Sequence, residues 1–259
     1  MKTVLMIFLS YAAPWVAAQA QSCSRQSPAH TVALLELYTS EGCSSCPPAD
    51  RALSQLRAQT NSATGLDQVV PLALHVDYWD HIGWKDLFSN KTFTERQRWL
   101  SNLANSRTVY TPEMFIAGQE LRNWSGGIAA AVQRINRQPA RADIGISLGR
   151  LSAGTLPVEV STRTAQAGNL FVALYENELV SKVRSGENGG ATLRHDYVVR
   201  QWVGPIALEA KADAGKVSLN RALAVPGSAV AHNLGVAAFV QSERGEVLQA
   251  LALPLCSAS

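Results

Sequence analysis

The order of the apolar segments restricts the possible folds of this chain more than any other property. Up to about residue 138, apolar runs typical of buried strands, such as Thr31–Tyr38 and Val69–Val76, alternate with segments that carry apolar residues at helical spacing, such as Ala49–Ala58 and Thr92–Asn105. This alternation predicts a parallel-containing sheet with helices on its faces.

The second half of the sequence has a different pattern. Beyond Gln138-Pro139, short β-rich segments are separated by turn residues, and helical spacing is absent. About eight strands at this spacing predict a small sandwich. We therefore expect an α/β domain over residues 28–138, followed by an all-β sandwich domain over residues 139–257.

The composition suits a globular protein with a core of its own. Of the 259 residues, 47% are hydrophobic and 17% are charged, which does not fit a disordered chain. The formal net charge of +3 is modest and there is no run rich in lysine and arginine, so we expect no nucleic-acid partner.

The first twenty residues have the pattern of a secretory signal. Lys2 is followed by the apolar run Val4–Val16 and by the small-x-small site Ala18–Ala20, which predicts a signal peptide over residues 1–20 with cleavage after Ala20. The apolar run is short and contains Pro14, so no stable membrane anchor is expected. This segment predicts a periplasmic or secreted protein.

Export decides how the cysteines are interpreted. The chain has four, and the economical pairing in an oxidising compartment is Cys43 with Cys46 and Cys23 with Cys256. The second pair is interpreted as a structural disulfide between the two ends of the mature chain. The alternative is that Cys23 is a free or intermolecular thiol.

The segment Cys43-Ser-Ser-Cys46 has the spacing of a redox dithiol. A helix N-terminus behind it would favour a thiolate, and the hydroxyls of Ser44 and Ser45 could stabilise that charge. The proline that follows Cys46 predicts a helix that begins at Pro47, with Cys46 as its N-cap. Glu41, just before the first cysteine, would oppose the thiolate.

The pattern of strand, dithiol, helix, strand, helix and Thr111-Pro112 before an apolar run resembles the thioredoxin fold. More narrowly, the sequence is similar to a family of secreted bacterial proteins of unassigned function with a thioredoxin-like domain, in the stretches "ELYTSEGCSSCPPAD", "HVDYW", "GWKD", "VYTPEM" and "LRHDYVVR". The resemblance implies that Cys43 is the attacking thiol, Cys46 the resolving thiol and Pro112 a cis-proline. It implies no cofactor.

Several polar and aromatic residues are expected at the same edge of the sheet as the dithiol. Asp77, Trp79 and Trp84 lie beyond the end of the second strand, where ligands bind in such topologies. With Thr111 they would form a substrate rim. Alternatively, the tryptophans only pack the loop against the fold.

These observations predict a thiol–disulfide oxidoreductase that acts on a protein or small thiol or disulfide substrate. Two alternatives stay open: a non-enzymatic binding protein with a structural disulfide, and a copper or zinc handler with His75 and His81 as the nearby candidate ligands. In the second half, Glu187, Asn188 and His195 are expected to form hydrogen bonds within their loop or contacts with the first half. The oligomeric state is not predicted.

Overall fold

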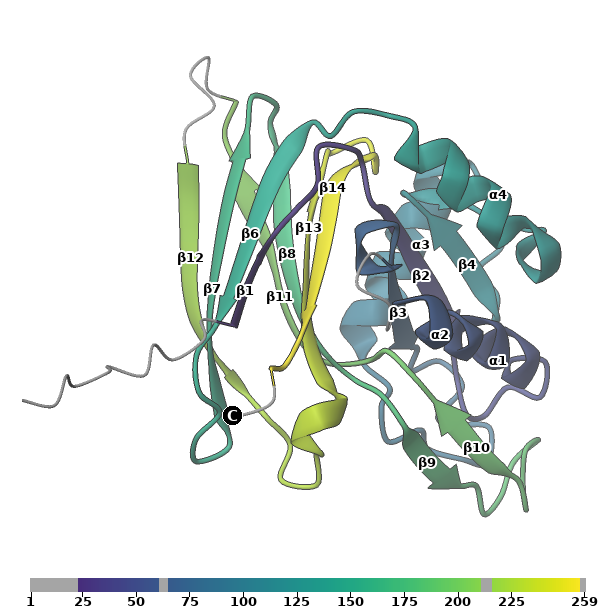
Figure 1. The fold of residues 1–259 in the computed structure, drawn as a ribbon. Coiled ribbons are helices and arrows are strands. Elements are labelled where there is room, and N and C mark those ends of the chain that lie inside the picture. The colour runs from purple at the N-terminus through teal and green to yellow at the C-terminus, as the bar shows by residue number, and fades with distance from the viewer. Residues whose placement is uncertain (1–22, 61–64, 211–215, 257–259) are drawn as a thin grey trace, which may run out of the picture.

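The computed structural model describes residues 23–60, 65–210 and 216–256, which fold around two sheets and a hairpin (Figure 1). In sheet order, the eight strands of the larger sheet are β14 (Val247–Pro254), β13 (Leu234–Gln241), β8 (Gly168–Glu176), β11 (Val198–Leu208), β3 (Val69–His75), β2 (Ala33–Thr39), β4 (Glu113–Ile116) and β5 (Gln119–Glu120). The four strands of the smaller sheet are β1 (Cys23–Gln26), β6 (Ala142–Leu148), β7 (Thr155–Thr164) and β12 (Lys216–Ala224). The hairpin consists of β9 (Leu179–Lys182) and β10 (Thr192–His195).

The helices gather around β2, β3 and β4, whereas the four-stranded sheet lies against the other end of the larger sheet (Figure 1). They are α1 (Pro47–Gln55), α2 (Arg57–Thr60), α3 (Lys91–Leu103) and α4 (Trp124–Asn136), with short 3-10 turns η1 (Gly65–Asp67) and η2 (Ala231–Asn233). The side chain of Asn90 caps α3 by accepting a hydrogen bond from the N–H of Thr92. Within the described ranges, none of these helices is long and apolar enough to cross a membrane.

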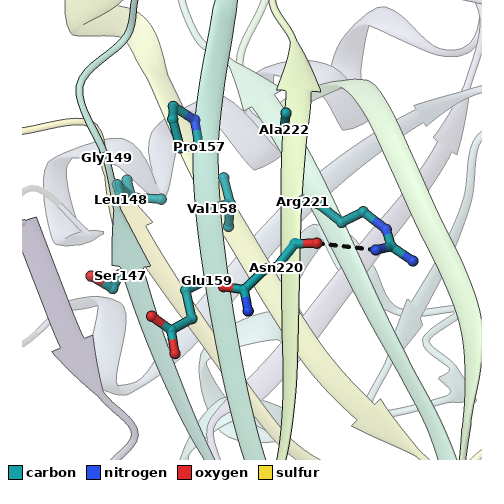
Figure 2. Close-up of a pocket in the computed structure, with 9 residues that line it drawn as sticks. All are labelled: Ser147, Leu148, Gly149, Pro157, Val158, Glu159, Asn220, Arg221 and Ala222. Carbon is teal, nitrogen blue, oxygen red and sulfur yellow. Dashed lines mark hydrogen bonds between the residues drawn. The ribbon is translucent and has the colours of Figure 1, made fainter.

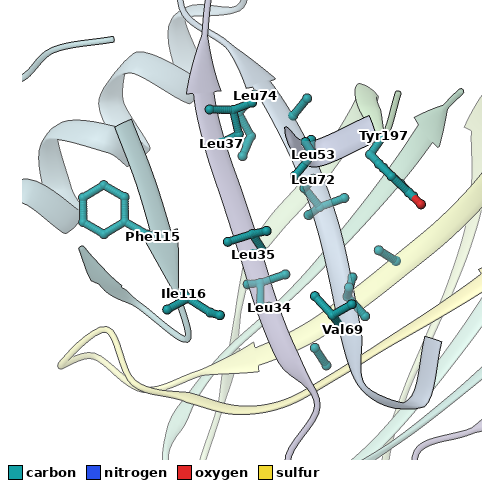
Figure 3. Close-up of a cluster of buried hydrophobic side chains, with 14 of the residues drawn as sticks. Leu34, Leu35, Leu37, Leu53, Val69, Leu72, Leu74, Phe115, Ile116 and Tyr197 are labelled. Carbon is teal, nitrogen blue, oxygen red and sulfur yellow. The ribbon is translucent and has the colours of Figure 1, made fainter. Parts of the chain in front are cut away.

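One hydrophobic core lies between the larger sheet and the helices. Strand β2 is buried along its whole length, because both of its sheet neighbours and the helices cover it. Leucines of β2 and β3 pack there with Leu53 of α1 and with Phe115 and Ile116 of β4 (Figure 3). This core holds in place the strand ends that carry the cysteine segment.

A second hydrophobic core lies between the two sheets, and strand β8 serves both cores. Its side chains alternate: Leu170, Val172 and Leu174 face the four-stranded sheet, whereas Phe171, Ala173 and Tyr175 belong to the first core. Strands β13 and β14 divide their residues in the same way. The larger sheet is therefore a middle layer that is covered on both faces.

The predicted fold class is wrong. The described chain is mostly β, with 43% strand and 19% helix. Strand β11 of the second half pairs in parallel with β3 of the first half at Val198 and Ala73, so one eight-stranded sheet runs through both halves. Within the described residues, nothing supports a separate thioredoxin-like α/β domain followed by a β-sandwich domain. The predicted signal peptide, residues 1–20, lies outside the described residues.

Candidate functional site around the Cys43–Cys46 disulfide

The cysteine segment connects the end of β2 to the start of α1, and Cys43 is bonded to Cys46. Helix α1 begins at Pro47 with Cys46 as its N-cap, which confirms the prediction made from the two prolines. Proline fits the first turn because an N–H at that position would have no partner within the helix. The carbonyl of Cys46 instead accepts hydrogen bonds from the N–H groups of Ala49 and Asp50.

The disulfide is buried although the residues between its cysteines are exposed. Cys43 and Cys46 both have 0% exposure, and Ser44 and Ser45 face solvent. The sulfur of Cys43 lies 3.3 Å from the hydroxyl oxygen of Ser45. A reagent must therefore displace some covering group before it can reach either sulfur.

The loop between β9 and β10, residues 183–191, is hydrogen-bonded to the cysteine segment. Both the N–H and the hydroxyl of Ser44 donate to a carboxylate oxygen of Glu187, at 3.0 and 2.8 Å. The side-chain amide of Asn188 donates to the carbonyls of Glu41 and Cys43, at 2.8 and 2.9 Å. The β9–β10 loop thus makes contacts with the first half of the chain, which is one of the two roles expected for Glu187 and Asn188.

A group of buried acidic and imidazole side chains lies behind the cysteine segment. Nδ1 of His75 is 2.6 Å from Asp86, and the same carboxylate oxygen accepts a hydrogen bond from the N–H of Glu41. Nε2 of His195 lies 3.3 Å from the Glu41 carboxylate, and its Nδ1 lies 4.0 Å from Asp50. The two imidazole rings meet edge to face, with centroids 5.0 Å apart.

Burial and mutual attraction act in opposite directions on these groups. Burial raises the pKa of the Asp50 carboxyl. Burial also opposes the charge of His75, but the nearby carboxylates, mainly Asp86, outweigh it and raise the pKa of the imidazole. For Glu41, burial is outweighed by the neighbouring side chains of His195, Ser181 and Trp84, so the pKa of its carboxyl is lowered. Asp50 and His75 therefore keep a proton more readily than usual, whereas Glu41 keeps its negative charge.

The predicted rim residues divide into two sets. The indole N–H of Trp84 donates to the Glu41 carboxylate at 2.8 Å, and the carbonyl of Thr111 accepts from the hydroxyl of Ser45 at 3.4 Å, so both contact the cysteine segment. Asp77 instead bonds to Thr94 in the first turn of α3. Trp79 is half-buried and packs beside Gly42, so it belongs with Trp84 and Thr111 as a contact of the cysteine segment.

Pro112 and the remaining cysteines have defined places. The Thr111–Pro112 peptide bond is cis, which is the isomer that the family resemblance implies. The second disulfide joins Cys23 to Cys256, so it ties β1 to the segment after β14. The cysteines are therefore paired as the export argument favoured, and the described chain has no free cysteine.

The two histidines considered as metal ligands lie in different environments. His75 is buried and bonded to Asp86, whereas His81 is exposed. In the part of the chain that the structure describes, no group of three or more histidine, cysteine, aspartate or glutamate residues could hold a metal ion.

A surface cavity of about 530 Å³ lies on the four-stranded sheet, and no residue of the cysteine segment lines it (Figure 2). Its polar side chains include Ser147, Glu159 and Asn220, and its nine lining residues contain neither cysteine nor histidine. It offers no group that would act with the disulfide.

Comparisons with known proteins agree with this fold. Residues 34–241 match the family described as "Protein of unknown function (DUF1223)". The crystal structure of protein AGR_C_4864 from Agrobacterium tumefaciens is similar, with 21% identity over 90% of this chain and 98% of that chain and a TM-score of 0.63. HBP35 of Porphyromonas gingivalis is 15% identical over 90% of this chain and 78% of that chain, with a TM-score of 0.66. No curated protein matches the sequence.

At these identities the two solved structures show a shared fold alone, whereas the family match covers most of the chain. The chain belongs to the DUF1223 family of proteins of unknown function.

Proposed function

We propose that the protein carries out thiol–disulfide exchange through Cys43 and Cys46. The observation that carries the proposal is the place of this disulfide, at the N-terminus of α1 and in front of the buried group formed by Glu41, Asp50 and His195. A helix N-terminus stabilises a thiolate, and a stabilised thiolate is also a good leaving group.

The proposed reaction needs no cofactor. In the reduced protein, the Cys43 thiolate attacks one sulfur of a substrate disulfide, and the substrate's other sulfur leaves as a thiolate. Cys46 then loses its proton and attacks Cys43 in the mixed disulfide, which releases the second substrate thiol. The substrate gains two electrons, the protein returns to the disulfide form, and the reverse sequence oxidises a dithiol.

The burial of both cysteines adds a requirement to this proposal. The β9–β10 loop is bonded to the segment through Ser44 and the carbonyl of Cys43, so we infer that it must move before a substrate can reach the sulfur. Two glycines with positive φ, Gly186 and Gly190, lie within the loop and allow its sharp turns.

The deciding measurement is the reduction potential of the Cys43–Cys46 pair in the purified mature protein, equilibrated with glutathione buffers and read by alkylation and peptide mapping. We expect a potential above about −300 mV, the range below which disulfides resist the glutathione pool. Mapping separates this pair from Cys23–Cys256, which serves as the internal control. A Cys46→Ser variant should then trap mixed disulfides on Cys43, and a Cys43→Ser variant should not.

A second candidate function is a binding protein in which Cys43–Cys46 is a fixed structural link. The complete burial of both cysteines favours it. A potential below about −300 mV, together with no trapped mixed disulfide, would support this function and defeat exchange.

We also propose that the protein acts outside the cytoplasm. Two disulfides in one chain suit an oxidising compartment. Cell fractionation and N-terminal sequencing test this: the mature protein should begin at Gln21 and be found in the periplasmic or culture fraction.

A further inference from the structure

A second pocket lies beside α3, at the end of β8 far from the β9–β10 hairpin. It has a volume of about 360 Å³, within the range of small-molecule sites. Its walls come from α3, from the starts of β8 and of the turn after β13, and from a bulge in β11. None of its lining residues belongs to the cysteine segment or to the β9–β10 loop.

The floor of the pocket is a buried arginine whose charge is already matched. Arg96 is 7% exposed and donates to both carboxylate oxygens of Glu36, at 2.6 and 3.0 Å, and to the side chain of Gln241 at 2.9 Å. Its guanidinium carbon lies 4.8 Å from the centre of the Phe171 ring and 5.2 Å from that of Trp202. Because Glu36 neutralises it, Arg96 orients these rings without requiring an anionic ligand.

The walls offer aromatic surface that the fold itself does not cover. Trp99 and Trp202 both line the pocket and are only half-buried. Phe171 lies between the sheet and the pocket, with its ring centroid 5.5 Å from that of Trp202. Partly open indole rings from two separate elements, α3 and β11, suit a flat apolar ligand.

A local irregularity of β11 shapes one side of the pocket. The register of β11 against β8 shifts between Val203 and Ile206, and the displaced Gly204 and Pro205 line the cavity. Gly204 has a φ of +126°, and a Cβ on it would lie 2.8 Å from the carbonyl oxygen of Leu170. Only glycine fits this position, and bulges of this kind often re-aim the chain at a binding site.

The rim of the pocket is acidic. Glu95 of α3 and Glu243 of the turn after β13 come from separate elements, and both are exposed. Lys91 approaches Glu95 at 3.4 Å, but both side chains are largely in solvent, so this pair is weak. Aromatic walls beneath two carboxylates attract positive charge.

We propose that this pocket binds a small organic ammonium compound, with its flat apolar body between Trp99 and Trp202 and its cationic group near Glu95 and Glu243. The inference does not depend on disulfide exchange, because the two sites share no residue.

The test is a calorimetric titration of the oxidised mature protein with 2-phenylethylamine, and in parallel with 3-phenylpropionate, which has a similar body and the opposite charge. We expect saturable binding of the amine with a dissociation constant below about 10 mM. The dissociation constant of the carboxylate should be at least about tenfold higher. Equal binding of both compounds, or no saturable binding of the amine, would overturn the proposal.

Variants then locate the binding. Glu95→Gln and Glu243→Gln change only exposed carboxylates, so the fold is retained, and together they should weaken amine binding about fivefold or more. Glu159→Gln, on the four-stranded sheet, is the matched control and should leave it unchanged. Trp99→Ala should abolish binding while the circular dichroism spectrum stays native. If the amine binds equally well to all these variants, this pocket is not its site.

Discussion

Glu187 accepts hydrogen bonds from the N–H and the hydroxyl of Ser44, which joins the β9–β10 loop to the exposed turn of the Cys43–Cys46 disulfide across 143 positions of sequence. These bonds lower the pKa of the Glu187 carboxyl, so the contact persists at neutral pH. The neighbouring Asn188 adds two bonds to backbone carbonyls of the same segment. We therefore expect the loop to limit how often the segment opens to solvent.

The first prediction concerns this control. In Asn188→Ala, two hydrogen bonds between the loop and the cysteine segment are lost, and the open state becomes more populated. Because each bond contributes about 0.5–1.5 kcal/mol, dithiothreitol should reduce Cys43–Cys46 about tenfold faster than in the unaltered protein. Timed alkylation followed by mass spectrometry measures the rate.

The control for this experiment is Asn220→Ala, which removes an exposed asparagine side chain from the four-stranded sheet. It should leave the rate unaltered, whereas Glu187→Gln should raise it. Equal rates in all four proteins would show that the β9–β10 loop does not limit access to the disulfide.

The second prediction concerns Glu113, the residue after Pro112. Its carboxylate is buried and accepts hydrogen bonds from Gln97 and Ser101, but burial prevails and raises its pKa to about 7. The folded state thus binds a proton that the unfolded chain has released above about pH 4.3, the ordinary value for glutamate. The stabilisation from the protonated Glu113 carboxyl is therefore complete below about pH 4.3, and it is lost as the pH rises to about 7.

Glu113→Gln removes this titration and keeps an acceptor oxygen. The variant's urea midpoint minus that of the unaltered protein should therefore be larger at pH 8 than at pH 5. Urea unfolding at several pH values measures the difference. A difference that does not vary with pH would contradict the raised pKa.

Local patterns in the sequence account for the elements but not for how the sheet is assembled. Strand β7 alternates between buried and exposed residues, as a strand with one solvent face should, whereas β8, "GNLFVALYE", is apolar almost throughout. That contrast could have indicated a middle layer covered on both faces. The neighbours of β8 and β11 could not be inferred, because the pairing of Val198 with Ala73 joins residues 125 positions apart (198 − 73) and leaves no periodic signal.

In the candidate site too, local sequence patterns predicted the elements but not the contacts between distant segments. The proline after Cys46 was enough to predict the start of α1, and the disulfide was predicted from the expected export together with the spacing of the cysteines. The contacts of Glu187 and His195 with the cysteine segment depend on the docking of the β9–β10 hairpin. The glycine-rich stretch around Glu187 was a signal for a loop, but the surface on which the loop lies is a tertiary property.

The third prediction concerns the Cys23–Cys256 disulfide. It links residues 233 positions apart and ties β1 to the end of the chain, so it restricts the unfolded chain strongly. The double variant Cys23→Ser, Cys256→Ser should lose about 2–5 kcal/mol of unfolding free energy. Urea unfolding under non-reducing conditions measures the loss. Unfolding free energies that differ by less than about 0.5 kcal/mol would contradict a stabilising role.

The fourth prediction concerns Glu36 and Arg96, which form an ion pair with side-chain exposures of 0% and 6%. Glu36→Gln leaves the guanidinium buried without its counter-charge and should cost about 3–5 kcal/mol, whereas Glu36→Leu combined with Arg96→Met removes both charges and should cost less. Lys91→Gln, in an exposed pair, is the control and should change stability by less than about 0.5 kcal/mol. Urea unfolding of the four proteins measures these values. If the double variant is less stable than Glu36→Gln, the prediction is wrong. The cost of Glu36→Gln would then not come mainly from leaving the Arg96 guanidinium without its counter-charge.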